Sequence, residues 1–90
     1  MFLYSLYDSK ADGFTPPFVA KNDDLACRTV IDTYRHVGEC QLTQYPEDFT
    51  LFRIGSWDED SGTIEGIDAK RSCGTVLQIV TAKIKEKEAE

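Results

Sequence analysis

Residues 49–67 read FTLFRIGSWDEDSGTIEGI, and this stretch decides the fold. Its first part, residues 49–57, is rich in the aromatic and β-branched side chains that favour strands. The acidic segment that follows ends in Ser61-Gly62 and supplies turn residues, and residues 63–68 are typical of a partner strand. The stretch therefore predicts a β-hairpin with strands at 49–57 and 63–68.

The N-terminal residues predict a third strand. Residues 2–8 are dense in aromatics that favour strands and are followed by polar residues. Both alternating faces of this segment, one starting at Phe2 and the other at Leu3, are largely apolar. Such a strand is typically covered on both sides, so we expect a helix on one side and a partner chain or ligand on the other.

One helix is predicted with clear ends. Between residues 23 and 37, apolar side chains recur at the spacing of a single buried helical stripe. Asn22 or Asp23 supplies the N-cap, and Gly38 follows the last turn as a C-terminal residue. The helix and the strands together predict an α+β fold, in which the helix 23–37 packs on one face of a mainly antiparallel sheet.

The remaining segments are less regular. Residues 18–20 predict a short edge strand and residues 39–48 a loop, whereas residues 72–82 fit either a strand or a helix. Residues 83–90 form a charged tract without an apolar face, which is expected to fray. We therefore predict one α+β domain over residues 1–82 and a charged tail over residues 83–90.

Composition limits the class of protein. The chain has 90 residues, of which 41% are hydrophobic and 29% charged, as expected for one small globular domain. Neither a transmembrane stretch nor a signal peptide is predicted, and three unevenly spaced cysteines favour a reducing compartment. A cytoplasmic location is expected. The net charge of −6 opposes binding to phosphate unless local cations and stacking provide it.

Motifs for catalysis or metal binding are weak. The acidic segment 58–62 does not match the ligand order of an EF-hand loop and is better explained as a solvated turn. Cys27, Cys40 and Cys73 lack the spacing of a zinc site. A nucleophilic pair of one cysteine with His36 stays open, although a histidine at a helix end more simply interacts with the helix dipole. We predict no enzyme, no metal and no cofactor.

Aromatic side chains on the predicted strands suggest a binding surface. Bases of single-stranded nucleic acid stack on such rings, and nearby cations hold the backbone. The candidate contact residues are Tyr4, Tyr7, Lys10, Lys21, Arg53, Trp57, Lys70 and Arg71. Alternation places Phe49, Leu51, Arg53 and Trp57 on one face of the long strand. By physical chemistry alone, a hydrophobic core and a homodimer interface explain these rings better than nucleic acid does.

Three stretches resemble a known family. They are FLYSLYDSK at residues 2–10, PPFVAKND at residues 16–23, and PEDFTLFRIG at residues 46–55 with the acidic turn after it. Together they resemble the small nonstructural protein of gokushovirus-type microviruses, tailless phages with single-stranded DNA genomes. The resemblance implies a DNA-binding, non-capsid protein that acts in the host bacterial cytoplasm while genomes are made and packaged. It assigns no contact residue.

Two functions follow as expectations. The first is a non-enzymatic protein that binds single-stranded DNA during genome synthesis or packaging and forms a homodimer or larger oligomer. The second is a protein-interaction factor that binds a viral replication or capsid protein without touching DNA. The acidic net charge favours the second, because an acidic surface attracts a basic partner.

Overall fold

The computed structural model describes the backbone of residues 1–89 and the side chains of residues 1–83. Its five strands form one antiparallel sheet: β1 (Phe2–Asp8), β2 (Gly13–Phe14), β3 (Phe18–Ala20), β4 (Phe49–Asp58) and β5 (Thr63–Thr75). The helices are α1 (Asp23–His36), α2 (Gln41–Gln44), the 3-10 helix η1 (Pro46–Asp48) and α3 (Val76–Ala89). The predicted α+β fold with an antiparallel sheet is therefore confirmed.

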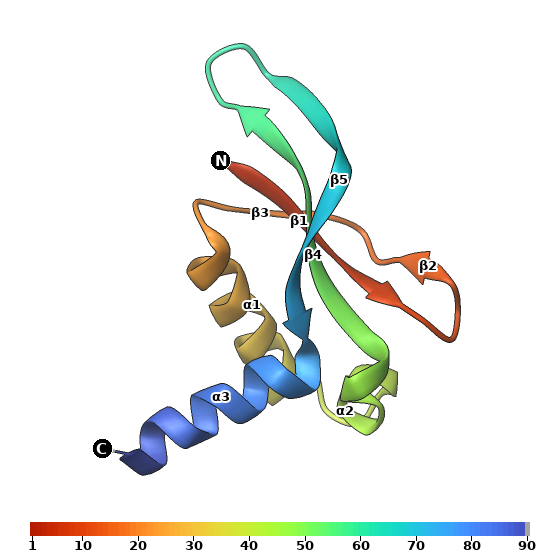
Figure 1. Ribbon diagram of the computed structural model, residues 1–90, viewed down its shortest axis with the longest axis vertical. Helices are drawn as coiled ribbons and strands as arrows, with labels where there is room; N and C mark the ends of the chain where they lie inside the picture. The colour runs from red at the N-terminus through yellow and green to blue at the C-terminus, as the bar shows by residue number, and fades with distance from the viewer. Residues whose placement is uncertain (90) are drawn as a thin grey trace.

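The strand order in the sheet is β2-β1-β4-β5, and β3 also pairs with β1. The predicted hairpin is β4–β5, and Figure 1 shows its tip projecting away from the helices. Gly62, with φ of 71°, closes the tip by donating its backbone N–H to the Asp58 carbonyl at 2.8 Å. Asn22 caps α1, as predicted, by accepting a hydrogen bond from the Leu25 N–H at 2.9 Å.

The core lies between one face of the sheet and the helices α1 and α3, which Figure 1 shows together at one end of the molecule. The buried apolar side chains are Tyr4, Ala20, Phe49 and Leu51 from the sheet, Ala26, Val30 and Ile31 from α1, and Val76 and Ile79 from α3. We call this side of the sheet the covered face. It confirms the helix that was predicted to cover one side of residues 2–8.

The other side of the sheet, which we call the open face, carries the alternate residues of the strands. Because directly paired residues of antiparallel strands point to the same side, Leu3, Tyr7, Val19, Phe52, Trp57 and Ile64 lie here. None of these side chains belongs to the core. The described part of the chain supplies only part of the second cover predicted for residues 2–8, because Ser5 is fully buried whereas Leu3 and Tyr7 remain half-buried.

Two segments differ from the sequence-based expectation. Residues 39–48 were predicted to form a loop, but they contain α2 and η1. The second strand of the hairpin was predicted to end at residue 68, but β5 continues to Thr75 before α3 begins. Thr75 and Gln78 explain the boundary, because each side chain accepts a hydrogen bond from the other's backbone N–H, at 3.1 and 2.9 Å. This is a capping box, which fixes a helix start.

The backbone of residues 83–89 continues α3, and residue 90 of the predicted tail lies outside the described residues. The division into a domain and a tail stays a prediction. Within residues 1–89, none of the helices combines the length and apolar character needed to cross a membrane.

Candidate nucleic-acid interface

The Asp23 carboxylate, at the start of α1, contacts three neighbouring side chains. The Tyr4 hydroxyl donates a hydrogen bond of 2.6 Å to its carboxylate, and the guanidinium groups of Arg53 and Arg71 lie 3.8 and 3.2 Å from it. The Arg53 guanidinium also lies 4.1 Å from the centre of the Phe2 ring, a cation–π contact. Arg53 and Arg71, both predicted as contact residues, are therefore held together by an acid on the covered side.

Tyr4 cannot act as predicted. Its exposed fraction is 0%, and its ring stacks on Phe18 with centres 5.9 Å apart. Burial, followed by the hydrogen bond to Asp23, raises the pKa of Tyr4 well above its usual range. The prediction that this ring stacks on a base is wrong for this fold, because the chain itself covers the ring.

Trp57 does not share a face with Arg53, contrary to the prediction. The register between β1 and β4 shifts by one residue after Arg53, so that Phe2 pairs with Ser56 and Leu3 with Gly55. Ser56 therefore points to the covered side, and Trp57 turns to the open face. An extra residue in one strand, a β-bulge, reverses the alternation beyond it in this way.

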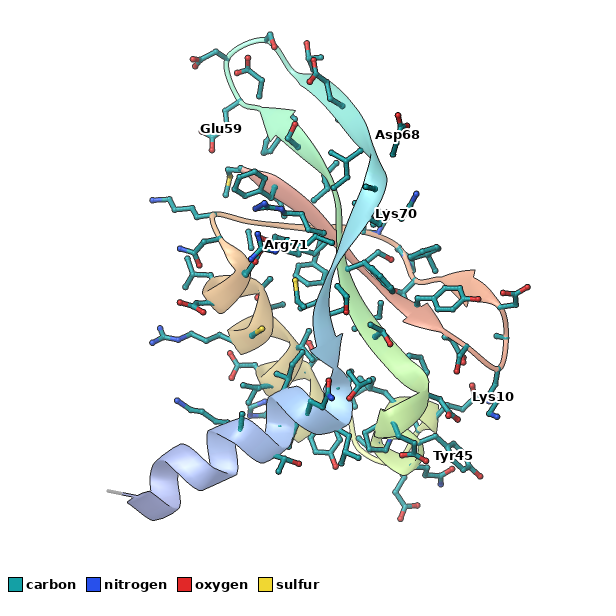
Figure 2. The ribbon with its side chains drawn as sticks, viewed as in Figure 1. Lys10, Tyr45, Glu59, Asp68, Lys70 and Arg71 are labelled. Atoms are coloured by element: carbon teal, nitrogen blue, oxygen red, sulfur yellow. The ribbon has the colours of Figure 1, made fainter. Side chains whose placement is uncertain are left out.

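The three predicted lysines are spread over the molecule. Lys10 lies in the turn between β1 and β2, Lys21 precedes α1, and Lys70 lies on β5, all of them exposed. Figure 2 shows Lys70 and Arg71 leaving β5 in opposite directions, with Arg71 toward α1 and Lys10 at the far end of the sheet near Tyr45. The structure does not bring these cations into one basic patch.

Three aromatic rings form a cluster on the open face. The Tyr7 ring centre lies 5.0 Å from that of Phe14 and 6.4 Å from that of Phe52, and the Phe14 and Phe52 centres are 6.1 Å apart. Phe14 is 48% exposed, and the Tyr7 hydroxyl donates a hydrogen bond to Asp12. This hydrogen bond is the main reason that the pKa of Tyr7 is raised. We call Tyr7, Phe14 and Phe52 the ring cluster.

Only Tyr7 of the ring cluster was among the predicted contact residues. Phe14 was missed because β2 is only two residues long. The signal was in the sequence, since Asp12-Gly13 between two aromatic segments is typical of a hairpin turn. Asp12 adopts a positive φ of 56°, which folds β2 back and places Phe14 opposite Tyr7.

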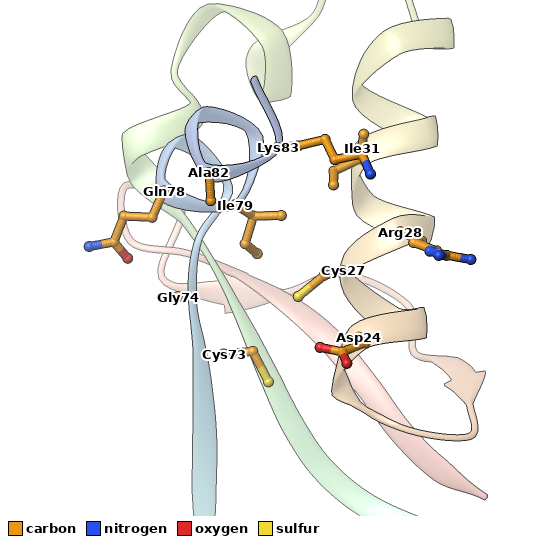
Figure 3. A pocket seen from close by; sticks show the side chains of 10 residues that line it. All are labelled: Asp24, Cys27, Arg28, Ile31, Cys73, Gly74, Gln78, Ile79, Ala82 and Lys83. Carbon is orange, nitrogen blue, oxygen red and sulfur yellow. The ribbon is translucent and has the colours of Figure 1, made fainter. Parts of the chain in front are cut away.

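Two thiols face a cavity between α1 and α3. Cys27 and Cys73 line this space of about 520 Å³ together with Asp24 and Ile79 (Figure 3). Burial raises the pKa of both thiols, which keeps them protonated and weakly nucleophilic. His36 lies elsewhere, with its Nδ1 atom 2.7 Å from the Asp32 carbonyl oxygen on the same helix.

The third thiol, Cys40, precedes α2 and is not among the cavity residues. A hydrogen bond from the Thr43 backbone lowers the pKa of this thiol. In the part of the chain that the structure describes, no three metal-binding side chains converge. The absence of enzymatic activity stays a prediction.

Comparison with known proteins gives one match. Residues 1–79 match the model of a protein family described as Phage ORF5 protein. No curated protein and no solved structure matches the chain.

Proposed function

The chain belongs to the Phage ORF5 protein family, and we propose that it binds single-stranded DNA on its open face without catalysing a reaction. The observation that carries this proposal is the ring cluster, in which Phe14 is exposed and Tyr7 and Phe52 are half-buried. Stacking of a base on such a ring contributes about 1–3 kcal/mol and needs no particular sequence. Duplex DNA offers no unstacked base and is expected to bind more weakly.

We further propose that this is the nonstructural protein of a gokushovirus-type microvirus, acting in the host bacterial cytoplasm during genome synthesis or packaging. The resemblance of residues 2–10, 16–23 and 46–55 supports this assignment, and the family match covers all three stretches. A phage with a single-stranded genome has a direct use for a protein that binds unpaired bases.

The distribution of charge makes DNA binding compatible with an acidic protein. Residues 57–69, the outer half of the β4–β5 hairpin, contain five acidic residues and no lysine or arginine. Subtracting these five charges from the total of −6 leaves −1 for the rest of the chain. Repulsion of phosphate is therefore concentrated at the hairpin tip. Lys10 lies in the turn that joins Tyr7 to Phe14, two members of the ring cluster.

Fluorescence anisotropy with labelled single-stranded and duplex oligonucleotides at low salt tests this function. We expect micromolar binding of the single strand, weaker binding of the duplex, and weaker binding of the single strand by Phe14→Ala. Leu25→Ala is the matched control, because this leucine is also exposed but lies on α1, away from the open face. Absence of binding to either oligonucleotide at tens of micromolar protein contradicts the proposal.

The hairpin tip supports a second candidate function. Asp58, Glu59 and Asp60 project from the molecule, and Figure 2 shows Glu59 at this end. An acidic projection of this kind fits a basic protein partner, such as a viral replication or capsid protein. Pull-down from infected cells distinguishes the two functions. Recovery of one viral protein that survives nuclease treatment and is lost in Glu59→Lys supports this candidate.

A further inference from the structure

Strand β5 leaves one long edge of the sheet unpaired. It has 13 residues and, among the described strands, it pairs only with β4. The free side of β1, by contrast, is occupied by β2 at one end and β3 at the other. Residues 63–73 contain no proline, so every backbone N–H on the outer side of this stretch can donate a hydrogen bond. Such an edge is a template for another strand.

The middle of β5 is also poorly paired on its inner side. The register moves from Arg53 opposite Arg71 directly to Gly55 opposite Gly66. Residues 67–70 therefore lie opposite Ile54 alone, and the ladder with β4 is irregular there. The part of β5 that is least tied to β4 is therefore the centre of the strand.

Symmetry restricts how β5 can pair with the β5 of a second copy. In an antiparallel pair related by a two-fold axis perpendicular to the sheet, equivalent residues of the two copies point to the same side. Directly opposed residues also point to the same side. The axis must therefore pass between the two copies of one residue, which lie directly opposite each other. Only registers centred on a residue are therefore allowed.

Charge selects one of these registers. With Ala69 at the axis, Asp68 of each copy faces Lys70 of the other, and Ile67 faces Arg71. Centring on Asp68 or Lys70 instead places two identical charges opposite each other. Cross-strand pairs of opposite charge stabilise a sheet, and like charges destabilise it.

We propose that two copies of the chain pair antiparallel along β5, with the two-fold axis at Ala69 and two Asp68–Lys70 pairs across the interface. The axis runs through the sheet, so the open faces of both copies lie on the same side of one continuous sheet. The two ring clusters then face the same way. This interface does not depend on the proposed DNA binding, although it would allow one strand of DNA to contact both copies.

Sedimentation velocity of the full chain tests the interface by charge exchange. We expect the wild type to sediment at twice the mass of the 10.2 kDa chain. Asp68→Lys and Lys70→Asp each create two like-charge pairs and raise the dimer dissociation constant by about tenfold or more. The double variant Asp68→Lys/Lys70→Asp restores both pairs and the dimer. Glu59→Lys, with the same charge change at the hairpin tip, stays dimeric.

The position of the axis has its own test. Opposed Cα atoms in an antiparallel pair lie about 4.5–5.5 Å apart, within the range of a disulfide. Ala69→Cys is therefore expected to form a covalent dimer on mild oxidation, beyond any background from the native cysteines. Ser61→Cys at the hairpin tip is the control and should not.

Several results would overturn the proposed dimer. A wild-type chain that stays monomeric at the highest soluble concentration overturns the proposal. A dimer whose dissociation constant does not change in Asp68→Lys or Lys70→Asp also overturns it, and so does a double variant that does not dimerise. In either case the interface lies on another surface. Circular dichroism of each variant, expected to match that of the wild type, shows that these exposed substitutions leave the fold intact. Anisotropy is measured separately, so failure to bind DNA leaves the dimer result unaffected.

Discussion

Tyr4 and Tyr7 both lie on β1 and both donate a hydrogen bond to an aspartate, but they belong to opposite faces of the sheet. The Tyr4 ring has no exposed surface and packs in the core, whereas Tyr7 lies in the ring cluster on the open face. Similar side chains therefore pack in the core on one face and stay partly exposed on the other. Stability and binding should respond to different substitutions.

The largest expected effect separates neighbours on β4. Leu51→Ala removes a fully buried side chain of the covered face and should lower the free energy of unfolding by about 2–5 kcal/mol. The adjacent residue Phe52 points to the open face, so Phe52→Ala should cost far less stability. Urea denaturation measures both. Equal losses would show that the open face belongs to the core.

Binding should show the reverse pattern. Phe14→Ala removes the most exposed ring of the cluster and should weaken binding of single-stranded DNA by about 1–3 kcal/mol, with little change in stability. Anisotropy titrations of Phe14→Ala and Val19→Ala compare the ring cluster with another exposed apolar residue of the same face. Equal binding by the two variants would show that the ring cluster does not contact the DNA.

The two tyrosines give the next largest difference. Tyr4→Phe removes a hydrogen bond to the Asp23 carboxylate and should lower stability by about 1–2 kcal/mol. Tyr7→Phe removes a bond at the surface, where water can replace the hydroxyl, and should change stability little. Urea denaturation of both variants measures the contrast. A larger loss in Tyr7→Phe contradicts the assignment of the two faces.

The pH dependence provides a second test of Tyr4. Because the pKa of this phenol is raised in the folded state, the unfolded chain loses the proton first as the pH rises above about 10. Stability is therefore complete below that pH and declines above it. Tyr4→Phe should flatten this decline in urea titrations at increasing pH. An unchanged slope would mean that another group causes it.

The smallest effect is expected at the ion pair of Arg71 with Asp23. The Arg71 side chain is 61% exposed, so Arg71→Ala should lower stability by only about 0.5 kcal/mol. Thermal denaturation at low and high salt measures this contribution, which salt should reduce. A loss as large as that of Tyr4→Phe would contradict the assignment of this ion pair to the solvent-exposed surface.

Sequence patterns predicted the main strands, α1 and the covered side, because each has a strong periodic signal. They placed Trp57 on the wrong face, since a single bulge after Arg53 reverses the alternation and leaves no trace in composition. They also left residues 72–82 ambiguous, although the capping box of Thr75 and Gln78 marks the start of α3.

The candidate site was harder to predict than the fold. Burial of Tyr4 and the meeting of Arg53 with Arg71 at Asp23 depend on how α1 packs over the sheet, which local sequence does not encode. The position of Phe14 beside Tyr7 depends on the pairing of β2 with β1, which the sequence analysis did not predict.

The division between the two faces can be tested most directly by NMR of the labelled protein titrated with a single-stranded oligonucleotide. The aromatic signals of Tyr7, Phe14 and Phe52 should shift on binding, whereas those of Tyr4 and Phe18 on the covered side should stay in place. Shifts confined to the covered side, or no shift in the ring cluster at saturation, would contradict the account.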